Sequence, residues 1–101
     1  MNFEQGKTYT IKLNSGEELI AKVTDIFTEE NTINITDPVS IAPAQGGMQM
    51  IPSMFTAEPG CSVTLNTTNV VMFSETEDSI KMKYIEATTG IKVPDKKIIL
   101  G

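Results

Sequence analysis

Apolar and polar residues alternate in the first part of the chain in the pattern of antiparallel β-strands. Tyr9, Ile11 and Leu13 alternate with polar neighbours, which is the period of a strand with one buried and one solvated face. Asn14-Ser15-Gly16 follows as a short turn, in which glycine supplies the positive φ of a three-residue hairpin loop. The sequence therefore predicts a β-hairpin near the start of the fold.

The alternation of the next strand slips near Asp25. Apolar residues occupy every second position from Leu19 to Val23, whereas the following apolar residues, Ile26 and Phe27, are adjacent. A slip of phase within a strand indicates a β-bulge or a sharp bend. We therefore expect this strand to be strongly bent.

The run from Thr32 to Ile41 alternates most clearly, and only Asp37 and Pro38 interrupt it. Asp37 falls on the inward face, where its carboxylate would line a pore or a subunit interface. Because an unpaired buried charge is costly, we favour a bulge at Asp37-Pro38 that turns the carboxylate back to solvent.

Proline and paired glycines in 42–47 predict a turn into a fourth strand, 48–56. This strand carries apolar groups on both faces, and Pro52 favours an edge position because proline lacks a backbone donor. Its three methionines, Met48, Met50 and Met54, suit an interface between subunits, although we favour the alternative that they fill gaps in the protein's own core.

The segment 62–73 ends in the apolar run Val70-Val71-Met72-Phe73, which predicts a buried strand. The sequence does not decide whether 62–73 is one bent strand or two short ones. Either choice leaves about five strands in the fold.

The pattern changes at Ser74. Ser74-Glu75-Thr76-Glu77 has the form of a capping box, and Ile80, Tyr84 and Ala87 share one helical face, with Gly90 as a C-terminal stop. Ile80, Met82 and Tyr84 also alternate as in a strand, but the two end signals favour a helix over 75–90. The tail 91–101 ends in Ile98-Ile99-Leu100, which we expect to dock on its own subunit or on the next one.

The segment from Ile11 to Val23, followed by Asp25, Asn31 and Ile33, resembles the first signature motif of the Sm and Sm-like (LSm, Hfq-type) proteins. That motif consists of a hydrophobic strand, a turn glycine, a long bent strand and an Asp…Asn loop before a third strand. The run Leu65 to Phe73 partly resembles the second motif, with Asn66-Thr67 where the family has Arg-Gly. The chain is also similar to short Sm-like proteins carried by bacteriophages.

The resemblance implies a five-stranded, strongly bent Sm-like (SH3-type) open barrel over 1–74, packed against the helix 75–90 and followed by the tail. It implies assembly into a homo-oligomeric ring, in which head-to-tail contacts remove the free strand edges. The interface residues that we expect are Met48, Met50, Met54, Val70 and Met72. The resemblance further implies binding of single-stranded RNA at the pore face, by Phe27, Asn31, Asn66, Thr67 and Thr68. For Phe27 and Asn31, a core phenylalanine and a turn asparagine remain the alternatives.

Charge weakens the expectation of RNA binding. The 101 residues carry a net charge of −5, and all eight basic residues are lysine. Arginine, the usual reader of phosphates and guanine edges, is absent. The alternative function is therefore an oligomeric scaffold or adaptor that binds protein partners, as in a phage-type assembly or a host interaction.

Composition also limits the chemistry. There is no histidine, and the single Cys61 has no histidine to activate it, so we expect no enzymatic activity, no cofactor and no metal. The N-terminus does not resemble a secretory signal, and no stretch approaches the roughly 18 apolar residues of a membrane span. We expect a cytoplasmic protein, in the host cytoplasm if it is of phage origin.

Overall fold

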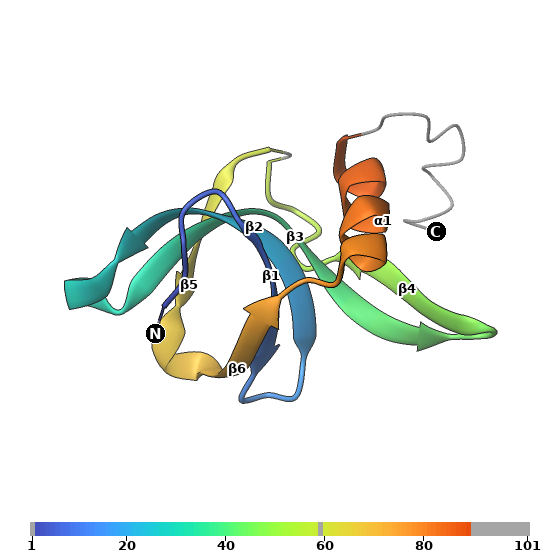
Figure 1. Ribbon diagram of the computed structural model, residues 1–101, viewed down its shortest axis with the longest axis horizontal. Helices are drawn as coiled ribbons and strands as arrows, with labels where there is room; N and C mark the ends of the chain where they lie inside the picture. Colours follow the sequence, from blue (N-terminus) through green and yellow to red (C-terminus); the bar gives the residue numbers. More distant parts are fainter. Residues whose placement is uncertain (1, 59, 90–101) are drawn as a thin grey trace.

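A computed structural model describes residues 2–58 and 60–89, which form six antiparallel strands and one C-terminal helix (Figure 1). The strands are β1 (Thr8–Leu13), β2 (Glu18–Phe27), β3 (Thr32–Ala44), β4 (Gly47–Pro52), β5 (Ser62–Asn66) and β6 (Val70–Glu75). Helix α1 spans Asp78–Thr89. Two 3-10 turns, η1 (Thr28–Glu30) and η2 (Thr67–Asn69), connect β2 to β3 and β5 to β6. The predicted all-β fold with a terminal helix is confirmed.

The segment 62–73, which the sequence left open, divides into two strands. The side-chain oxygen of Asn66 accepts a hydrogen bond from the backbone N–H of Thr68, 3.0 Å away, and this bond starts η2. The turn separates β5 from β6, so the described residues contain six strands where about five were expected.

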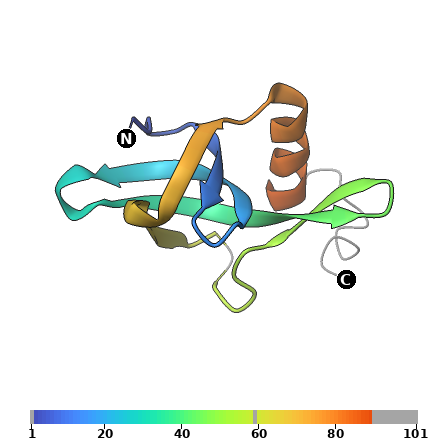
Figure 2. The ribbon, with the colours of Figure 1, turned by 90° about the horizontal axis from the view of Figure 1, so that it is seen from below.

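The sheet curls around one hydrophobic core. Its strands follow the order β4-β3-β2-β1-β6, and β5 pairs with β3. Side chains from β1, β2 and β3 meet those of β5 and β6 in this core, so the five strands enclose it as an open barrel (Figures 1 and 2). The buried members are Phe3, Tyr9, Ile11, Leu19, Ala21, Val23, Ile33 and Ile35, with Leu13, Val63, Leu65, Val70 and Phe73 packed against them.

Both predicted interruptions of the strands are β-bulges. The register of β2 with β3 shifts between Val23 and Asp25, and it shifts again between Ile20 and Lys22, opposite Asp37. Asp37 has φ of 48°, a left-handed conformation that aspartate tolerates better than most residues. At this bulge β3 changes partners, because it pairs with β5 through residue 36 and with β4 from residue 39.

The predicted turn over 42–47 is too long. Strand β3 continues through Pro43 to Ala44, and only Gln45 and Gly46 connect it to β4. The pairing of β3 with β2 ends at Ser40, so one edge of β3 is open beyond that point and proline is tolerated there. The β3–β4 hairpin therefore extends beyond the barrel, and its strand β4 pairs only with β3 within the described residues (Figure 2).

Helix α1 is present as predicted, but it begins at Asp78 and the expected capping box does not form. Ser74 still belongs to β6, where it pairs with Thr10 of β1. The carboxylate of Glu77 caps the helix instead, because it accepts hydrogen bonds from the Ser79 hydroxyl at 2.6 Å and from the Ile80 N–H at 3.3 Å. Gly90 and the tail 91–101 lie outside the described residues.

A second, smaller core holds α1 on the sheet. Ile20 of β2, Val39 of β3 and Tyr84 of α1 are buried together, and Ile41, Met50 and Ile80 pack against them. The predicted helical face of Ile80 and Tyr84 is therefore the face that contacts the sheet.

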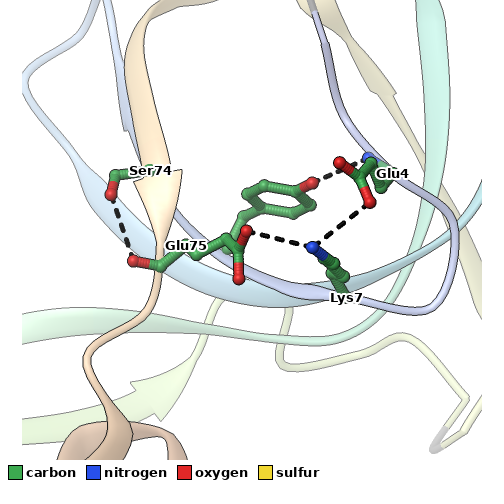
Figure 3. Close-up of polar contacts among 5 residues, drawn as sticks. Glu4, Lys7, Ser74 and Glu75 are labelled. Carbon is green, nitrogen blue, oxygen red and sulfur yellow. Dashed lines mark hydrogen bonds and ion pairs between the residues drawn. The ribbon is translucent and has the colours of Figure 1, made fainter.

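The segment before β1 is attached to β6. The ring of Phe3 stacks on Phe73, with centroids 4.1 Å apart. The Lys7 ammonium lies between the carboxylates of Glu4, at 3.2 Å, and Glu75, at 3.1 Å (Figure 3). The hydrogen bonds to Glu75 and then Glu4 raise the pKa of Lys7, but such an exposed ion pair adds little stability.

Candidate binding and assembly surfaces

Two loops that are far apart in the sequence meet at one end of the barrel. The backbone N–H and the hydroxyl of Thr67 both donate to the carbonyl oxygen of Asn31, at 2.8 and 2.9 Å. Beside this contact, Asn66 pairs with Thr32 at the end of the β3–β5 ladder. The five predicted RNA-binding residues lie on these two loops, and we call them the loop surface: Phe27, Asn31, Asn66, Thr67 and Thr68.

The local conformation of the two loops decides which groups of the loop surface are exposed to a ligand. Asn31 ends η1 with φ of 57°, so it fulfils the predicted role of a turn asparagine. The side-chain oxygen of Asn66 is occupied within η2, where it also accepts from the Thr68 hydroxyl at 2.7 Å. Phe27 is 41% exposed, which rules out the alternative of a core phenylalanine. The loop surface therefore offers one exposed aromatic ring beside polar turns.

Negative charge lies beside the loop surface. Glu29 and Glu30 form the body of η1 and are both exposed. Neither 27–31 nor 66–69 contains a lysine. In nucleic-acid binding, attraction between cations and the phosphate backbone supplies most of the affinity. Two carboxylates with no lysine in either loop instead repel that backbone.

Strand β6 exposes two adjacent apolar side chains. Lys12 of β1 pairs with Met72 but Leu13 pairs with Val70, so Val71 is an extra residue in β6. This bulge leaves Val71 58% and Met72 62% exposed. Among the described residues β6 pairs only with β1, so these side chains border an unpaired strand edge.

The other predicted interface residues lie in three different surroundings. Val70 packs against the barrel core. Met48 is 54% exposed near the tip of the β3–β4 hairpin, where it pairs with Pro43. Met50 and Met54 both line the groove described next. Among the predicted interface residues, only Met72 lies on β6 with a largely exposed side chain.

A groove of about 420 Å³ lies between the β3 bulge, the end of β4, the loop after β4, the start of β5 and the last turns of α1. Its apolar walls include Val39, Met50, Met54, Phe55 and Ala87, and Cys61 also contributes to the lining. We call it the β4–α1 groove. The sequence did not indicate it, because its walls come from five segments that only the folded chain brings together.

The helix side of the groove is fixed by Tyr84. Its hydroxyl lies 3.1 Å from the carbonyl oxygen of Thr36 and 3.0 Å from that of Asp37, and it donates to this pair. Burial, and then the neighbouring Asp37 carboxylate, raise the pKa of Tyr84. The phenol is therefore a neutral donor that holds α1 against the β3 bulge.

The described part of the chain contains no cluster of three or more Cys, Asp or Glu residues with the geometry of a metal site. Within residues 2–58 and 60–89, no helix has the length and apolar character that crossing a bilayer requires. No family model matches the sequence, and comparison with curated proteins gives no match either.

Proposed function

We propose that this protein is a non-enzymatic, Sm-like scaffold that assembles into a homo-oligomeric ring and binds other proteins. The observation that carries the proposal is the pair of exposed apolar residues, Val71 and Met72, on the unpaired edge of β6. An open strand edge with apolar side chains is a surface that proteins cover or pair with another chain.

The same molecule also has a second open strand edge, with which β6 of another copy could pair. Strand β5 pairs only with β3 within the described residues, so its other edge is also open. Pairing β6 of one copy with β5 of the next is a head-to-tail contact, which closes into a ring when the rotation between copies is suitable. A chain of 101 residues buries a small core, so burial between copies adds stability that one copy lacks.

The charge of the protein favours the scaffold proposal over nucleic-acid binding. The net charge of −5 and the exposed Glu29 and Glu30 oppose the approach of a polyanion. They do not oppose a protein partner with basic or apolar groups.

Light scattering coupled to size-exclusion chromatography tests the assembly. A mass that is a fixed multiple of 11.0 kDa and does not change on dilution supports the proposal. A mass of one chain at micromolar concentration contradicts it.

A second candidate function, binding of single-stranded RNA, is favoured by the junction of the two loops. The contact of Thr67 with Asn31 places the exposed ring of Phe27 and the polar turn of η2 on one end of the barrel. Base stacking on an aromatic ring is the sequence-tolerant part of single-strand recognition.

Titration of labelled U-rich and A-rich oligonucleotides at low salt separates the two functions. Binding that weakens steeply with salt supports the RNA candidate. No binding up to about 100 μM, the weak end of ordinary non-specific affinity, excludes it and leaves the scaffold.

A further inference from the structure

The β4–α1 groove lies where the described chain ends. Ala87 and Thr88, in the last turn of α1, are part of its lining, and α1 ends at Thr89. The helix therefore ends at the edge of the groove, and the twelve residues 90–101 follow it in the sequence.

The chemistry of the groove and of the tail is complementary. Among the described residues the lining is mainly apolar, includes the acidic Asp37 and Glu58, and contains no lysine. The tail contains Ile91, Val93 and the run Ile98-Ile99-Leu100, and it carries three lysines, Lys92, Lys96 and Lys97, against one acid, Asp95. An apolar segment with cations suits an apolar groove with carboxylates.

We propose that the tail 91–100 docks in the β4–α1 groove of its own subunit. The nine residue steps from Thr89 to Ile98 span up to about 30 Å when extended, so the apolar end can reach a groove whose lining includes Ala87 and Thr88. Attachment to the helix that forms one wall gives the tail a millimolar effective concentration at the groove. A separate peptide or another subunit lacks this advantage.

The single cysteine provides a direct test, because Cys61 is partly exposed and lines the groove. The rate at which Cys61 reacts with a small alkylating reagent is measured for the original protein and for the double variant Ile98→Glu/Leu100→Glu, both as the full chain. Docking protects the thiol, so the variant should react about tenfold faster, as expected when a reagent reaches a site only in its open fraction. Equal rates would overturn the proposal.

Met82→Glu is the matched control, because Met82 is 63% exposed on α1 and does not line the groove. It introduces a carboxylate without disturbing docking, so its Cys61 rate should equal that of the original protein. An increase as large as that of the tail variant would also overturn the proposal.

A crosslink identifies the subunit that supplies the tail. Cysteine is placed singly at Ile98, Ile99 or Leu100 of the full chain, and the protein is oxidised mildly. At least one variant should form a disulfide with Cys61 within the same chain, visible on a non-reducing gel as a monomer without free thiols. Disulfide-linked dimers alone, or free thiols in all three variants, would overturn docking within one subunit.

Discussion

The hydroxyl of Tyr84, on α1, donates to the main-chain carbonyl oxygen of Asp37, 3.0 Å away, at the bulge where β3 changes partners. This contact joins the helix to the bulge in the longest strand, β3. It also fixes two walls of the β4–α1 groove relative to each other, since Asp37 and the end of α1 both line it.

Replacing Tyr84 by phenylalanine should lower the free energy of unfolding by about 1 kcal/mol, because the ring stays buried while the carbonyl oxygens lose their donor. Tyr84→Ala should cost about 3–5 kcal/mol, since it also leaves a cavity. Urea denaturation measures both values. Met82→Ala, at an exposed position, is the control and should stay within about 0.5 kcal/mol of the original protein. A Tyr84→Phe protein as stable as the original would show that the hydrogen bond contributes nothing.

Stability at alkaline pH should depend on the same residue. Burial and the Asp37 carboxylate raise the pKa of Tyr84 above the unfolded value of about 10, so the folded state retains the phenol proton more strongly. This contribution is complete below about pH 10 and is lost as the pH rises above it. Between pH 8 and 11, urea denaturation should show a larger loss for the original protein than for Tyr84→Phe. An equal loss of stability with pH in the two proteins would contradict the raised pKa of Tyr84.

Glu77, not Ser74, should control the start of α1. Hydrogen bonds from the Ser79 hydroxyl and then from the Ile80 N–H lower the pKa of Glu77. A lowered folded pKa stabilises the protein above the unfolded value of about 4.3, and this is lost as the pH falls through the folded pKa. Glu77→Ala should therefore destabilise the protein at pH 7 and make no difference at pH 2. Ser74→Ala is the control, because the Ser74 hydroxyl bonds to the Glu75 carbonyl oxygen and not to the helix. A larger loss of stability for Ser74→Ala than for Glu77→Ala would instead support the capping box that the sequence predicted.

Assembly should respond to a charge on the edge of β6. Met72→Lys places an ammonium group on an apolar side chain that is 62% exposed, so we expect the oligomer to dissociate at micromolar concentration while the barrel stays folded. Light scattering measures the mass and circular dichroism the fold. Met82→Lys makes the same change on α1, where exposure is 63%, and should leave the mass unchanged. Equal masses for the two variants would show that Met72 on β6 is not part of the interface between subunits.

If RNA binds the loop surface, two substitutions should act in opposite directions. Phe27→Ala should weaken binding by about 1–3 kcal/mol, which is the usual contribution of one stacked base. The double variant Glu29→Gln/Glu30→Gln should strengthen it, because two charges that repel phosphates are removed. Fluorescence anisotropy at fixed salt measures both. Affinity unchanged in both variants would place any RNA site elsewhere.

Local sequence predicted the elements whose conformation is decided by near neighbours. Gly16 occupies the hairpin turn with φ of 95°, as its position required. The slip of alternation near Asp25 and the interruption at Asp37 are both bulges, because side-chain alternation follows directly from the pleat of the strand. The helix was also predictable from the spacing of Ile80 and Tyr84.

Local sequence was misleading at positions where pairing with another strand decides where an element begins or ends. Ser74 looked like a helix cap, yet pairing with Thr10 holds it in β6. Pro43 looked like a strand terminator, yet it is accommodated where β2 no longer pairs with β3. In both cases a neighbouring strand, distant in sequence, determined where the element ends.

The sequence alone thus determined the presence of the first hairpin, the two strand interruptions and the helix, because their patterns depend on residues a few positions apart. Only the tertiary structure decided that Asn31 meets Thr67, that Val71 and Met72 face outward, and that five segments form one groove. Those features depend on the register between distant strands, which fixes which loops adjoin and which edges stay open.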